Sequence, residues 1–235
     1  MLADKPDGSR ATHRFMIGRA LKRSRGTHAG EVIGYQPIKP PYSPAEVAAF
    51  VSLARHQPTD AKRRSLSALV ALAVGAGLSG PEMASISPSR LHIVALDGDQ
   101  SALLVEVSGR RARTAVMSAQ FRHLLDEAVR IHRESGRGED DLLLGGRPGR
   151  REAVGPVRQN IVVADGRKVD LDASRLRSTW LVAAMETRVP LATLMRAAGL
   201  GSARSFADLL PYCAAPDPAD IARVLAAVTT TGGVA

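Results

Sequence analysis

The sequence contains a single cysteine, Cys213, and no apolar run long enough to cross a bilayer. One cysteine excludes an internal disulfide, which is typical of proteins that work in a reducing compartment. The first residues, 1–7, are polar and do not open a signal peptide. We therefore expect a cytoplasmic protein without a membrane partner.

Aromatic residues make up only 3% of the chain, which disfavours base stacking as the main way of binding single-stranded nucleic acid. The six histidines are not spaced as zinc ligands, and one cysteine cannot complete such a site. The glycine-rich stretch 145–149 lacks the Lys-Ser/Thr pair of a phosphate-binding loop. No metal site and no cofactor are expected.

Positive charge is what the chain has in excess. The formal net charge is +9, and arginine supplies most of the positive charge. Arginine binds phosphate oxygens through its planar fork, and clustered cations gain affinity by releasing counterions from nucleic acid. Because aromatic residues are scarce, double-stranded DNA is the expected partner. A surface that merely reflects an arginine-rich genome remains the alternative.

The pattern of residues along the chain separates a tail from an ordered part. Residues 1–41 form a basic lead with scattered Gly and Pro, which we interpret as a tail or linker. A capping box with Pro at the first helical position, Ser43-Pro44-Ala45-Glu46, begins the ordered part. Apolar residues at helical spacing and cap signals predict further helices at 62–76, 81–86, 119–134, 174–187, 190–198, 202–210 and 218–228.

Between two of these helices the pattern is extended. Apolar runs predict three strands at 91–96, 102–107 and 113–117, and the first two are joined by the hairpin signal Asp97-Gly98-Asp99-Gln100. The Gly- and Arg-rich stretch 135–156 is expected to be a loop, and 160–172 is ambiguous between strand and helix. The sequence therefore predicts a mainly α fold with a small three-stranded antiparallel β-sheet, of the α+β class. A C-terminal helix and tail are expected at 213–235.

Two motifs and this order of elements resemble one family. The segment Ser174-Arg175-Leu176-Arg177-Ser178-Thr179 is similar to the His-x-x-Arg-His/Trp-Thr motif of tyrosine recombinases (phage integrases). Gly75-Ala76-Gly77-Leu78, followed by Glu82, is similar to the segment that carries their first catalytic arginine. The resemblance covers about residues 43–212. It implies a tyrosine-recombinase-like catalytic domain at 42–212 and DNA binding connected with recombination or integration.

In this family a tyrosine attacks a DNA phosphate, two arginines clamp the phosphate oxygens, and a lysine on a hairpin turn protonates the leaving oxygen. His or Trp residues support the phosphate and the proton transfers. Carried onto this chain, Ser79 stands at the first arginine and Arg177 at the second. Arg110 is nearest to the lysine position, and Ser174 takes the His position. The resemblance thus implies a weakened clamp and a poor proton donor, because arginine hardly gives up its proton.

The remaining catalytic positions are apolar. Leu200 stands at the last His or Trp position, and Leu209, nine residues later, stands in the tyrosine register. Tyr212 comes about one helical turn later. We therefore expect a catalytically impaired relative, a pseudoenzyme, whose candidate catalytic residues are Arg177, Tyr212, Arg110 and Ser174. The candidate DNA-binding residues are arginines of the loops and of the second motif: Arg110, Arg111, Arg113, Arg147, Arg150, Arg175 and Arg177.

Other functions stay open at this point. One is an active tyrosine recombinase that uses Tyr212 as its nucleophile. Another is a helix-turn-helix regulator, because the helices at 191–198 and 202–210 are joined by Gly199-Leu200-Gly201. A relic without selected activity is a further alternative. Family members carry a helical core-binding domain before the catalytic domain, and only about 40 residues precede Ser43. A recombinase partner or a second copy of this chain is therefore expected to complete the grip on DNA.

Overall fold

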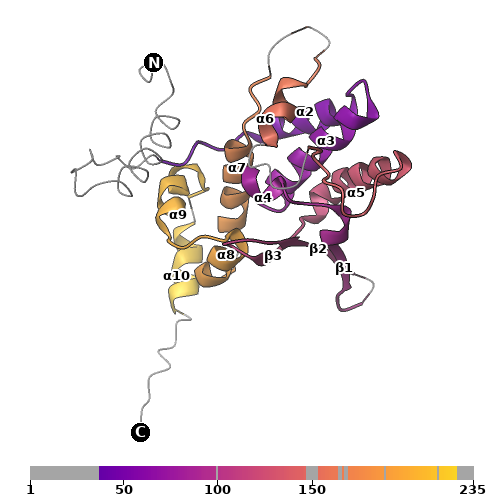
Figure 1. Cartoon of the computed structure of the whole chain (residues 1–235). Helices are drawn as coiled ribbons and strands as arrows, with labels where there is room; N and C mark the ends of the chain where they lie inside the picture. Colours follow the sequence, from indigo (N-terminus) through magenta and orange to yellow (C-terminus); the bar gives the residue numbers. More distant parts are fainter. Residues whose placement is uncertain are drawn as a thin grey trace, which may run out of the picture. The chain divides into compact units, whose positions relative to one another are not determined.

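The computed structural model describes residues 37–98, 100–146, 153–163, 166, 169–187, 189–215 and 217–226 (Figure 1). The chain divides into two compact units, Met1–Pro37 and Ile38–Ala235. Apart from Pro37, the first unit lies outside the described residues, and so does most of the tail expected at 1–41. Within the described ranges, no helix is long and apolar enough to cross a membrane.

Two helices pack side by side at the start of the second unit. The predicted capping box is confirmed: α2 (Pro44–Arg55) begins after Ser43, whose side chain accepts from the Glu46 amide while Glu46 accepts from the Ser43 amide. Helix α3 (Asp60–Val70) is capped by Thr59. The prediction of one continuous helix at 62–76 is wrong in its last part, because η1 (Ala71–Gly75) is π-helical. Every residue of that turn is buried, so tertiary packing rather than helix propensity decides its geometry.

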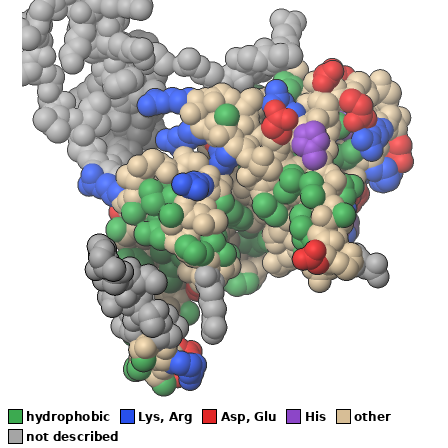
Figure 2. All heavy atoms as spheres, turned by 90° about the horizontal axis from the view of Figure 1, so that it is seen from below, with side chains coloured by type: hydrophobic (Ala, Val, Ile, Leu, Met, Phe, Trp, Pro, Cys, Tyr) green, Lys and Arg blue, Asp and Glu red, His purple; other side chains and the backbone are tan. Residues whose placement is uncertain are grey.

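The predicted sheet is confirmed. Strands β1 (Leu91–Ala95), β2 (Ser101–Val107) and β3 (Arg113–Val116) pair antiparallel in the order β1-β2-β3 (Figure 1). One face of β2 is buried through Leu103, Val105 and Val107, which alternate with more exposed residues as a half-buried strand requires. The sheet also leaves large apolar side chains in solvent, Ile93 and Val116 among them. Figure 2 shows hydrophobic side chains gathered in patches on the underside of the molecule.

The remaining elements follow the predicted order. Short helices α4 (Gly80–Met83) and η2 (Pro88–Arg90) precede the sheet, and α5 (Ala119–Glu134) follows it with the predicted bounds. Helix α6 (Val154–Gln159) begins inside the stretch expected to be a loop, and Ile161–Val163 is neither strand nor helix. The C-terminal elements are α7 (Ala173–Met185), α8 (Leu191–Ala198), α9 (Arg204–Leu209), η3 (Leu210–Tyr212) and α10 (Pro218–Ala226).

The apolar core has two parts. The larger part joins α2, α3, η1, the sheet and α5, with buried residues such as Leu69, Val105 and Leu124. The smaller part joins α7, α8 and α9 through Leu181, Leu194, Ala198, Phe206 and Leu209. Because α7 also packs on η1 and α8 packs beside β3, the segments similar to recombinase motifs meet in one region.

Candidate phosphate-binding site

The region around the first motif is organised by Glu82. Its carboxylate accepts hydrogen bonds from the Ser79 amide at 2.7 Å and from the Ser79 hydroxyl at 2.8 Å, which forms a capping box at the start of α4. Ser79, which the sequence resemblance matches to the first catalytic arginine, therefore caps a helix and binds the carboxylate. Helix α4 is only one turn long, and so short a helix has few hydrogen bonds of its own. The capping hydrogen bonds therefore stabilise it.

Arg113 reaches the same carboxylate from β3. Its Nη1 lies 2.5 Å from Glu82 Oε1, and its Nε donates to the Ala197 carbonyl at 2.8 Å. The Arg113 side chain is only 8% exposed. A Cβ at Gly199 would lie 2.8 Å from Arg113 Nη1, so the missing side chain at Gly199 leaves room for the guanidinium. Arg113 thus ties the sheet to α4 and to the end of α8.

Arg177 approaches Glu82 from α7. Its Nη1 lies 3.4 Å from Glu82 Oε2 and also donates to the Gly77 carbonyl, while Nη2 donates to the Ala198 carbonyl at 2.5 Å. The second arginine of the motif is therefore held by two backbone carbonyls and one carboxylate. Its side chain is 12% exposed, so little of the guanidinium faces solvent.

The titration of these groups follows from burial and from their partners. Burial raises the pKa of the Glu82 carboxyl, but hydrogen bonds from Arg113 and Ser79 outweigh burial and hold the pKa below its ordinary value of 4.5. Burial lowers the pKa of the Arg177 guanidinium, against the raising effect of Glu82, and nearby Arg113 lowers it further. Two guanidinium groups share one carboxylate, so the cluster of Arg113, Glu82 and Arg177 keeps an excess of positive charge.

A groove of about 630 Å³ lies beside this cluster, between the turn that joins β2 to β3 and the end of α8. The turn contributes Arg110 and Arg111, both exposed, and α8 contributes exposed Arg196. Arg113 and Leu200 also line the groove. The structure thus brings Arg110, Arg111 and Arg113 of the predicted set together. Sequence analysis missed Arg196, since only the packing of α8 beside β3 places it near the turn.

Two other predicted residues lie on α7. Ser174 is exposed one turn before Arg177, and its amide donates to the cap residue Asp172 at 2.7 Å. The Arg175 guanidinium lies over the Tyr42 ring, 3.8 Å from its centroid. Arg175 also donates to the Pro40 carbonyl at 3.2 Å and to the Pro41 carbonyl at 3.3 Å, so it fastens the segment before α2. Arg147 and Arg150 lie outside the described residues.

The positions matched to the last His or Trp and to the tyrosine are part of the smaller core. Leu209 is completely buried beside Phe206 and Leu194, and Leu200 packs against the same cluster. Tyr212 lies in η3, one turn further, and is 48% exposed. Tyr212 thus stands three residues after Leu209, the residue matched to the tyrosine position.

Comparisons with known proteins support the fold. No family model matches the chain, and no curated protein sequence matches it. Among solved structures, XerA recombinase matches with a TM-score of 0.53 and 13% identity over 96% of this chain and 85% of XerA. XerH site-specific recombinase, bound to its difH substrate before cleavage, matches with a TM-score of 0.53 and 16% identity. That match covers 88% of this chain and 58% of XerH. The chain has the tyrosine recombinase catalytic-domain fold.

Proposed function

We propose that this chain is a DNA-binding protein of the tyrosine recombinase family that does not cleave DNA efficiently. The observation that carries the proposal is the groove beside the arginine cluster, which is lined by exposed Arg110, Arg111 and Arg196. Guanidinium groups bind phosphate oxygens in a bidentate way and release counterions from duplex DNA. The recombinase XerH was solved bound to a DNA substrate, and by this likeness we assign duplex DNA to the groove.

The cluster of Arg113, Glu82 and Arg177 beside the groove supports DNA binding more than DNA cleavage. Arg113 and Arg177 are held by Glu82 and by backbone carbonyls, so a phosphate reaching them would compete with existing partners. Arg110 and Arg111 are exposed and are therefore the first groups that a phosphate would meet. On sequence grounds Arg147 and Arg150 extend the proposed interface.

Efficient cleavage is not expected because five positions depart from the family pattern, and one of them is Ser174 at the first His position. Ser79 replaces the first arginine, Arg110 stands near the lysine position, Leu200 replaces His or Trp, and Leu209 occupies the tyrosine register. Loss of one oxyanion-stabilising group alone costs about 10²–10³ in rate in well-studied enzymes. A misplaced nucleophile adds to this loss, since positioning supplies several kcal/mol of the barrier reduction.

The DNA proposal is tested by fluorescence anisotropy with a labelled duplex at rising salt. The double variant Arg110→Ser/Arg196→Ser should weaken binding and reduce the slope of log K against log salt by about two, since each phosphate contact contributes roughly 0.9. The matched control is Arg130→Ser/Arg133→Ser, which removes two exposed arginines from α5 and the same net charge. Equal losses in both variants would mean that the groove is not the binding site.

A second candidate function is an active recombinase that uses Tyr212, because this side chain is 48% exposed. A duplex with a nick beside the cleavage position traps a covalent product if one forms. We expect no adduct from the wild-type chain. An adduct that disappears in Tyr212→Phe would replace the first proposal by the second.

A further inference from the structure

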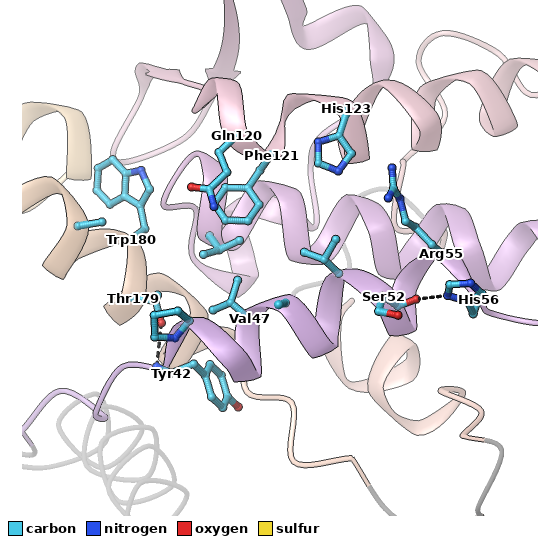
Figure 3. A pocket seen from close by; sticks show the side chains of 15 residues that line it. Tyr42, Val47, Ser52, Arg55, His56, Gln120, Phe121, His123, Thr179 and Trp180 are labelled. Atoms are coloured by element: carbon cyan, nitrogen blue, oxygen red, sulfur yellow. Dashed lines mark hydrogen bonds between the residues drawn. The ribbon is translucent and has the colours of Figure 1, made fainter.

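A cavity away from the arginine groove is a feature that DNA binding leaves unexplained. It lies between α2, α5 and α7 and measures about 560 Å³ (Figure 3). This volume falls in the range of about 300–1,000 Å³ that is typical of small-molecule pockets. Most of its wall is apolar, which is also typical of such pockets.

One end of the pocket is aromatic. Trp180 and Phe121 form this end (Figure 3), and Val47 and Val51 of α2 add further apolar lining. Trp180 is held in place by Gly77, whose φ is +64°, and a Cβ there would lie 2.3 Å from Trp180 Cε3. The ring can pack this closely only because position 77 has no side chain. Close packing against Gly77 favours a preformed aromatic wall, and a preformed wall lowers the cost of binding.

The other end of the pocket carries cationic and hydrogen-bonding groups. Figure 3 shows Arg55 and His56 of α2, with His123 of α5, at the end away from Trp180. Arg55 Nε lies 4.0 Å from Glu127 Oε2, at the distance limit of an ion pair. Of the described residues that line the pocket, none is Asp or Glu. The polar end thus offers donors that favour a negatively charged group.

We propose that this pocket binds a small amphipathic anion. Its flat apolar body lies against Trp180 and Phe121, and its carboxylate or sulfonate lies at Arg55 and His123. The aromatic end would take the apolar half of such a molecule, and the cationic end would take its anionic half. This pocket and the arginine groove share no lining residue, so the proposal goes beyond the proposed DNA binding.

The test uses the fact that Trp180 is the only tryptophan of the chain. The probe is 1-anilinonaphthalene-8-sulfonate, an anion with an aromatic apolar body that accepts energy from tryptophan. We expect saturable quenching of Trp180 emission together with enhanced probe emission. N-phenyl-1-naphthylamine has the same apolar body without the sulfonate, and we expect it to bind about fivefold to tenfold more weakly.

A matched pair of variants on α2 tests the location. Ala48 is exposed and lines the pocket, whereas Ala49 is exposed and does not line it. Ala48→Phe should fill the cavity and weaken sulfonate binding by about tenfold or more, and Ala49→Phe should leave it unchanged. Equal binding to both variants would overturn the proposal, because it would place the probe elsewhere or in a loosened core.

A second pair tests the charge. Arg55→Gln should weaken binding of the sulfonate by about fivefold to tenfold and leave binding of the uncharged probe unchanged. Arg90→Gln removes an arginine outside the pocket and should change neither affinity. If Arg55→Gln affects both probes equally, or affects neither, the anionic part of the proposal is wrong.

Discussion

Arg113 Nη1 lies 2.5 Å from Glu82 Oε1, and the two side chains are only 8% and 12% exposed. Arg113 comes from β3 and Glu82 from α4, so this pair joins the sheet to the segment that resembles the first catalytic motif. Glu82 also accepts from Ser79 and lies 3.4 Å from Arg177. The residues that resemble a phosphate clamp are thus held together by a carboxylate of the chain itself. These contacts of Glu82 should therefore contribute to the stability of the fold.

Removing the charge of Glu82 should destabilise the fold strongly. In Glu82→Gln, two nearly buried guanidinium groups lose their counter-charge, and we expect the free energy of unfolding to fall by about 3 kcal/mol. Urea unfolding followed by circular dichroism measures this change. Glu134→Gln, at an exposed pair with Arg130, is the control and should change little. Similar small effects in both variants would contradict a structural role for the cluster.

The same carboxylate should make stability depend on pH. The folded-state pKa of Glu82 lies below the ordinary value of 4.5, so the unfolded state binds more protons as the solution becomes acidic. The contribution of Glu82 is therefore complete above pH 4.5 and is lost as the pH falls through the lower, folded-state pKa. The difference in unfolding free energy between wild type and Glu82→Gln should shrink over this acidic range. A difference that stays constant with pH would show that the charge of Glu82 is not responsible.

Gly77 should not tolerate a side chain. Ala at this position would keep a φ of +64° and place its Cβ 2.3 Å from the Trp180 ring. Gly136, with a φ of +70° and no atom within 4 Å of an added Cβ, provides the backbone control. We expect Gly136→Ala to cost about 1 kcal/mol from left-handed strain. Gly77→Ala should cost at least about 2 kcal/mol more, with a shift of Trp180 emission. Equal costs would mean that the ring moves aside freely.

Restoring tyrosine at the family register should not restore cleavage. Leu209 is completely buried, and Leu209→Tyr adds volume and a hydroxyl to the smaller core. We expect a loss of about 1–3 kcal/mol in unfolding free energy. No covalent adduct with a nicked duplex should form, since Ser79 and Leu200 remain. A stable, adduct-forming variant would mean that the tyrosine register alone accounts for the missing activity.

The sequence by itself determined the local structure. The Ser43–Glu46 capping box, the alternation along β2 and the bounds of α5 follow from hydrogen bonds and side-chain periods within a few residues of the chain. The motif around Arg177 is also a short stretch of sequence, and together with the order of predicted elements it indicated the fold class. It did not predict the π-helical turn at Ala71–Gly75, whose geometry depends on what packs around it.

Only the tertiary structure decided how the arginines are used. Arg113 and Arg177 stand 31 and 95 residues from Glu82. No local period relates such positions, and the folded chain alone brings them to one carboxylate. Arg196 lines the same groove as Arg110 and Arg111 because α8 packs beside β3. Arg175 instead lies over the Tyr42 ring. Whether an arginine faces solvent or a buried partner depends on contacts between distant segments, and those contacts form when the apolar faces of α7, α8 and the sheet are buried together.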